Sequence, residues 1–167
     1  EPDRAAGHRS VFVQATKEWL SLTSASGVAV DLWALEEHLD QADAAEEATD
    51  IRGALGHYAM VLSLWRGEPL ADTSYAPWAE PVRAVIRARF IAAALRAGEL
   101  WLSAGDLDAA RRAAERALAA DRFCEPAHQL LIRSHLAAGN RSAALMATEA
   151  CRVMLAELGI EMQVSTG

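Results

Sequence analysis

The C-terminal half of the sequence repeats itself with a period of 34 residues. The dipeptide Gly105-Asp106 recurs as Gly139-Asn140. Four residues near the first dipeptide also have a residue of the same type 34 positions later: Leu102, Ala104, Ala110 and Ala113. Self-similarity at a fixed period of this length is typical of repeat proteins, in which each unit buries its apolar face against its neighbours. The period therefore predicts a stack of similar units.

Apolar residues at helical spacing, with capping residues between them, predict that the units are helical. Asp31 is a good N-cap, and Gly105, Gly139 and Gly159 are helix stop signals. We expect helices at about 32–48, 51–65, 78–103, 107–120, 125–138 and 141–158, with a loop at 67–77. Only the segment 11–23 is rich in β-forming residues, and it predicts a small hairpin over 12–22.

The helix pairs resemble the tetratricopeptide repeat. The residues that carry this resemblance are Gly98, Trp101, Gly105, Leu107, Ala110, Ala117 and Asp121. An insertion of 22 residues, made of the loop 67–77 and the start of the next helix, separates the first helix pair from the later ones. The expected fold class is all-α: a tetratricopeptide-like helical repeat superhelix with a small N-terminal β-hairpin. Such repeats leave a concave groove for partners.

A second resemblance is more specific than the repeat. Residues 64–72 read LWRGEPLAD, and residues 76–80 read APWAE. Together with the entry 30–32 and the end 155–161, they resemble the bacterial transcriptional activation domain of SARP-type regulators. The resemblance covers roughly residues 28–161. In these regulators the domain follows a DNA-binding winged helix, whose last element is a β-hairpin.

The resemblance implies three parts. Residues 1–27 are a linker and hairpin, a candidate remnant of a winged-helix domain. Residues 28–161 are the activation domain, and 162–167 are a tail. The recognition helix that would enter the DNA major groove lies outside the chain.

Trp65 and Trp78 flank the proline-containing loop of this motif. Each indole carries a large apolar area and one N–H that needs an acceptor when it is buried. We expect them to clamp the loop onto the helices, and direct contact with a ligand is the alternative. Four residues form the expected structural signature: Trp65, Gly67, Pro69 and Pro77. Arg66 and Trp78 are candidate contact residues.

Charge is distributed unevenly along the chain. Residues 1–50 hold eleven acids and three bases, a net of −8, whereas the rest is close to neutral. DNA binding needs a net positive surface, so DNA contact is expected only through a domain outside this chain. The dense acidic run between Glu36 and Asp50 is either a surface for a basic partner or a solvated helix face.

Arg83 and Arg87 lie one helical turn apart in the long predicted helix. They share a helix face, so they are candidates for binding an anionic ligand or an acidic partner. The alternative is that they are exposed and pair with Glu80 and other acids. With Trp101 they would form a site for an anionic effector.

No motif for catalysis, metal binding or a cofactor occurs. The chain lacks P-loop, GxGxxG, GxSxG and HExxH patterns, and Cys124 and Cys151 are too far apart for a CxxC pair. His128 and His135 share a helix face but have no evident third ligand. We therefore expect no enzyme activity, no metal and no cofactor. Without a signal peptide or a long apolar run, the expected location is the cytoplasm, with no membrane contact.

Three functions remain open. The first is a regulatory module of a transcription factor that acts by protein contact: with a second copy of itself, with its own winged-helix domain or with RNA polymerase. The second is a sensor in which the same groove binds an anionic nucleotide or metabolite. The third is a tetratricopeptide adaptor that binds a peptide.

Overall fold

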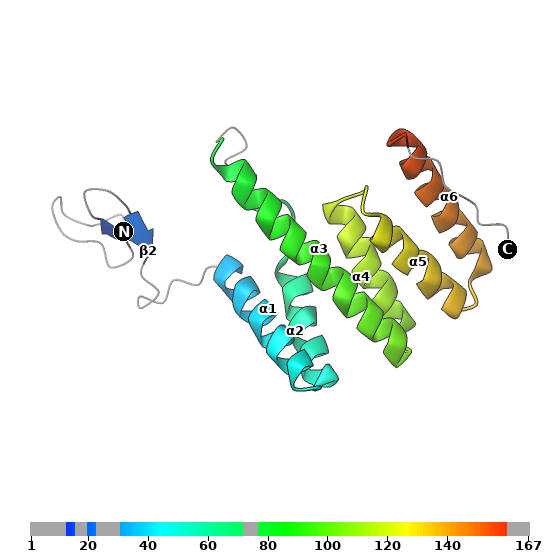
Figure 1. The fold of residues 1–167 in the computed structure, drawn as a ribbon, viewed down its shortest axis with the longest axis horizontal. Helices are drawn as coiled ribbons and strands as arrows, with labels where there is room; N and C mark the ends of the chain where they lie inside the picture. The colour runs from blue at the N-terminus through cyan, green and yellow to red at the C-terminus, as the bar shows by residue number, and fades with distance from the viewer. Residues whose placement is uncertain (1–12, 16–19, 23–30, 72–76, 160–167) are drawn as a thin grey trace.

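The computed structural model describes residues 13–15, 20–22, 31–71 and 77–159. Six helices account for most of these residues: α1 (Asp31–Glu47), α2 (Ile51–Leu64), α3 (Ala79–Ala104), α4 (Leu107–Ala120), α5 (Glu125–Ala137) and α6 (Arg141–Glu157). Consecutive helices pack side by side in one row (Figure 1). From residue 31 onward the described chain is thus all-helical and has the form of a helical repeat, and its helix bounds lie within about two residues of those predicted.

In each helix pair, the second helix begins with the same capping arrangement. Asp50, Asp106 and Asn140 are the N-caps of α2, α4 and α6, and each accepts a hydrogen bond from the backbone N–H three residues later. Each N-cap follows a residue with positive φ: Thr49, Gly105 or Gly139. Asp106 and Asn140 are 34 residues apart, and Asp50 lies 56 residues before Asp106, which is one period plus the 22-residue insertion.

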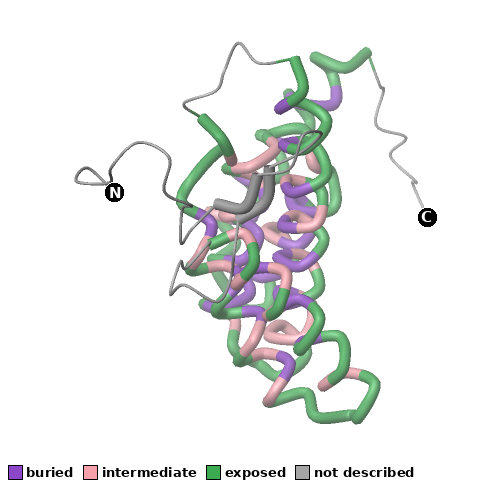
Figure 2. Tube along the Cα trace, turned by 90° about the vertical axis from the view of Figure 1, so that its left-hand side faces the viewer, coloured by how far each residue is buried: buried purple, intermediate pink, exposed green. Residues whose placement is uncertain are grey.

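The core changes in character along the row of helices. Large side chains join α1, α2 and α3: Leu35, Leu39, Tyr58, Val61, Trp65, Ile86 and Phe90. Where α3, α4 and α5 meet, Ala94, Ala117 and Ala127 form a cluster of buried small residues. Gly98 lies at the same place, where an added Cβ would come within 2.3 Å of Leu130 Cδ2. Small residues there let the helices approach closely, and the buried positions follow the inner sides of the helices (Figure 2).

The apolar residues of α2 are not all buried. Tyr58 and Trp65 are buried and Ala54 is fully buried, whereas Ile51 is exposed. The three buried side chains belong to the core that joins α1, α2 and α3.

Two three-residue strands precede the helices. β1 (Val13–Ala15) and β2 (Leu20–Leu22) pair antiparallel, with Val13 opposite Leu22. The residues that join them and connect them to α1 lie outside the described residues. The structure therefore does not establish the N-terminal hairpin as part of the fold, and the hairpin stays a prediction, as does the tail 162–167. Within the described ranges, no helix is both long and apolar enough to cross a membrane.

Candidate functional site

The segment from Trp65 to Ala71, here called the signature loop, follows α2 and lies against α3. Trp65 is the C-cap of α2 and stacks on Phe90 of α3, with ring centroids 4.3 Å apart and planes 12° from parallel. Gly67 then has φ +137°, a conformation that glycine adopts without strain. The buried indole fixes the start of the loop, so the expected clamping role of Trp65 agrees with its position.

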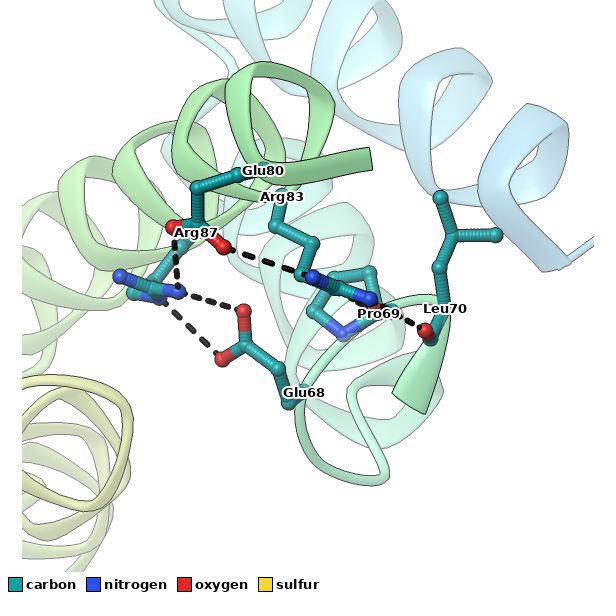
Figure 3. A network of polar contacts seen from close by, with 6 residues as sticks. All are labelled: Glu68, Pro69, Leu70, Glu80, Arg83 and Arg87. Atoms are coloured by element: carbon teal, nitrogen blue, oxygen red, sulfur yellow. Dashed lines mark hydrogen bonds and ion pairs between the residues drawn. The ribbon is translucent and has the colours of Figure 1, made fainter. Parts of the chain in front are cut away.

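Arg83 holds the far end of the loop. Its Nε donates a hydrogen bond to the Pro69 carbonyl at 3.1 Å, and Nη2 donates to the Leu70 carbonyl at 2.8 Å. Nη1 lies 3.4 Å from the Glu80 carboxylate. Only 6% of Arg83 is exposed, so these bonds are made away from water. Figure 3 shows the guanidinium reaching from α3 to the loop backbone.

Arg87, one turn later, holds the same loop through a side chain. Its Nε donates to Glu68 Oε2 at 3.2 Å, and Nη2 lies 3.9 Å from Glu80 (Figure 3). The hydrogen bond to Glu68 is the main reason why the pKa of Arg87 is raised above its ordinary value. Both arginines therefore fasten the loop. Sequence reasoning placed them on one face but did not distinguish the buried one from the half-buried one.

Arg116 of α4 fastens the loop from the other side. Its Nη2 donates to the carbonyls of Leu62 and Trp65 at the end of α2, and its guanidinium carbon lies 6.0 Å from the centre of the Phe90 ring. Arg116 was not among the candidate site residues predicted from the sequence. Helical periodicity contained a usable signal, because Arg116 is one turn from the buried Ala113 and next to the buried Ala117.

Trp78 is not buried against the described part of the loop, as the expected clamping role would require. Of its surface 62% is exposed, because it stands at the start of α3, where the first turns extend beyond the start of α1 (Figure 1). Val82 and Val85 follow on the same face and are 40% and 60% exposed. We call Trp78, Val82 and Val85 the α3 apolar face. Pro77, just before it, is also exposed.

A cavity of about 390 Å³ lies between the signature loop and the first turns of α1. Its walls are mostly apolar, and Arg66, which is exposed, stands at its edge. Asp31 and Leu32 of α1 line the same cavity as Leu70 and Ala71. The point where the chain enters α1 is therefore next to the signature loop.

Trp101 lies elsewhere, so the structure does not bring it together with Arg83 and Arg87. Eighteen residues of one helix separate Trp101 from Arg83, which is about 27 Å along the helix axis. Trp101 lines a different cavity, of about 440 Å³, between α2, α3 and α4. The anionic site predicted from these three residues is therefore not assembled in this arrangement.

The acidic run is partly paired with α3. Arg89 contacts Glu36 at 3.0 Å and Asp40 at 3.8 Å. Arg96 Nε donates to Glu46 Oε2 at 2.8 Å, and this bond lowers the pKa of Glu46 below its ordinary value. Three acids of the run thus connect α1 to α3. Among the described residues, no three His, Cys, Asp or Glu side chains are grouped so that they could hold a metal ion.

The fold and the fastened loop together define a class: an all-helical repeat domain with one long insertion between its first and second helix pairs. A family model, the bacterial transcriptional activator domain, matches residues 30–166. The chain belongs to this family, which confirms the resemblance noted in the sequence. Neither the comparison with curated proteins nor that with solved structures gave a match. The family is regulatory and not a family of enzymes, and membership indicates a role in transcription regulation.

Proposed function

We propose that this domain is the regulatory module of a SARP-type transcription regulator and docks on the regulator's own winged-helix DNA-binding domain. The α3 apolar face is the docking surface. The tetratricopeptide-like superhelix, the interpretation of 1–27 as a winged-helix remnant and a cytoplasmic location belong to the same proposal. No chemistry is assigned to the domain.

The observation that carries the proposal is the exposure of the α3 apolar face. Trp78, Val82 and Val85 lie at positions i, i+4 and i+7, so they form one stripe on the helix. Grouped apolar side chains rimmed by polar ones mark contact surfaces, and tryptophan is enriched among the residues that dominate binding energy. On the other side of α3, Arg83 and Arg87 hold the signature loop, which fixes the first turns of the helix and so reduces the entropy lost on binding.

Two further features favour the winged-helix domain as the partner. The chain enters α1 beside the signature loop, since Asp31 shares a cavity with Leu70 and Ala71. A domain joined at that point is held at high local concentration near the α3 apolar face. In addition, α1 has seven acids and no Lys or Arg, and four of the acids form no ion pair with a described residue. DNA-binding domains are basic, so their approach to this helix is favoured by charge.

The test uses the full-length regulator with the double substitution Val82→Asp/Val85→Asp. Leu145→Asp/Met146→Asp on α6 is the matched control, because those two side chains are 72% exposed. We expect the α3 variant to lose promoter activation by about tenfold or more and to change its affinity for DNA, whereas the control keeps both.

Other outcomes identify other partners and contradict the docking. Loss of activation with unchanged DNA affinity indicates contact with RNA polymerase. A halved molar mass in light scattering indicates a second copy. Unchanged activation means that the surface has no regulatory role. The peptide adaptor remains a prediction that no feature of the described residues favours.

A further inference from the structure

We infer that the cavity at Trp101 is a binding site for a small planar anion, an aromatic ring that carries a carboxylate or phosphate. The cavity lies between α2, α3 and α4, and its volume of about 440 Å³ is within the range of small-molecule sites. It is distinct from the α3 apolar face and from the cavity beside the signature loop.

The walls of the cavity combine an apolar surface with positive charge. Trp101, Leu62 and two alanines supply the apolar part, and Arg112 and Arg116 supply the charge. An indole face suits a flat ring, and a guanidinium suits a carboxylate or phosphate because its planar fork matches two oxygens.

Arg112 has its guanidinium available for a ligand. It is exposed, and it forms no ion pair or hydrogen bond with any other described residue. The acid in the cavity wall, Glu115, does not neutralise it, because Glu115 accepts a hydrogen bond from Arg111 at 2.6 Å. Most arginines of the inner helices differ, since Arg89, Arg96 and Arg133 each pair with a glutamate.

Arg116 connects this cavity to the signature loop. It lines the cavity, and it also donates to the carbonyls of Leu62 and Trp65, where the loop begins. Its Nε is buried without a partner in the described part of the chain. An anion bound beside Arg116 competes with those two carbonyls for its donors. Binding of the anion therefore changes the contacts that hold the signature loop. Only a further effect on docking at the α3 apolar face rests on the proposed function.

The experiment is an NMR titration of the 167-residue chain, followed at the Trp101 indole N–H, which a Trp101→Phe variant assigns. Two probes carry ring and anion together, adenosine 5′-monophosphate and anthranilate. Adenosine carries the ring without the anion, and inorganic phosphate carries the anion without the ring. We expect saturable shifts with adenosine 5′-monophosphate and anthranilate, and at least tenfold weaker binding of adenosine and inorganic phosphate.

Two variants test the role of the charge. Arg112→Gln is expected to weaken both ring-plus-anion probes about tenfold. Arg52→Gln, another exposed arginine without an ion pair to any described residue, is the control and leaves binding unchanged. Absence of saturable shifts, or equal effects of the two variants, overturns the site.

The link to the loop has its own readout, the backbone amide of Gly67. A shift there on saturation supports the link, and its absence with a shift at Trp101 overturns the link while the site stands. Because the titration needs no partner protein, its result is independent of whether the α3 apolar face docks on the winged helix.

Discussion

Replacing Arg83 by methionine tests whether this residue fastens the signature loop. Methionine keeps an unbranched apolar stem in the buried position but donates no hydrogen bond. A hydrogen bond to a charged group contributes about 1.5–3 kcal/mol. Arg83 makes such bonds to the Pro69 and Leu70 carbonyls. Leu70 is exposed, so its carbonyl regains water, and removing a buried charge recovers part of the loss. We expect Arg83→Met to lower the free energy of unfolding by about 2 kcal/mol.

Arg87→Met is the matched control. Arg87 also holds the loop, but its side chain is 31% exposed and that of Glu68 is 39% exposed. Exposed ion pairs contribute about 0–1 kcal/mol, so we expect a loss of about 0.5 kcal/mol. Urea denaturation followed by circular dichroism measures both variants.

Trypsin gives a local readout, because Arg66 is a cleavage site within the loop. Cleavage requires the loop to open, so its rate follows the free energy of opening. We expect cleavage after Arg66 to be about tenfold faster or more in Arg83→Met and only a few-fold faster in Arg87→Met. Equal stability and equal cleavage rates in the two variants would refute the assignment of Arg83 as the residue that fixes the loop.

Three further changes have expected outcomes. The Arg96 hydrogen bond lowers the pKa of Glu46, so the stability that this carboxylate contributes is present above the ordinary carboxyl pKa and is lost as the pH falls through the lowered pKa. Glu46→Gln should therefore lower the free energy of unfolding by about 1 kcal/mol at neutral pH. The difference from the unsubstituted protein should shrink between about pH 5 and pH 2, which urea denaturation across pH measures. Thr49 has φ 61°, which is strained for a β-branched residue. Thr49→Gly should therefore raise the free energy of unfolding by about 0.5–1 kcal/mol, seen as a higher thermal midpoint. A lower midpoint would contradict the strain at Thr49. Gly98→Val should lower the free energy of unfolding in urea by about 2–3 kcal/mol, because the valine side chain would meet the fully buried Leu130. Gly56→Val is the control, because an added Cβ at Gly56 meets nothing within 4 Å.

The helices were predictable because their signals are local. Capping residues such as Asp106 and Asn140, and the glycines before them, specify each turn within a few residues of sequence. The 22-residue insertion was predictable too, since it shifts Asp50 out of the 34-residue period. These signals need no knowledge of how the helices pack.

The site was less predictable because it depends on packing between distant segments. Arg83 and Arg87 look equivalent in the sequence, yet only Arg83 is buried, because the loop folds back over it. Trp78 was expected to be buried, but α3 extends past its neighbours at that point. In contrast, the rise of an α-helix per residue already places Trp101 far from Arg83 along one helix. A common site of Trp101, Arg83 and Arg87 could therefore have been excluded from the sequence alone.

Hydroxyl-radical footprinting tests the docking of the α3 apolar face most directly. Trp78 is 62% exposed and Met146 is 72% exposed, and both side chains are readily oxidised. Oxidation rates are compared between the 167-residue chain and the full-length regulator by mass spectrometry. Docking on the winged-helix domain predicts that Trp78 is protected several-fold in the full-length regulator while Met146 is unchanged. Equal oxidation of Trp78 in the two proteins would contradict it.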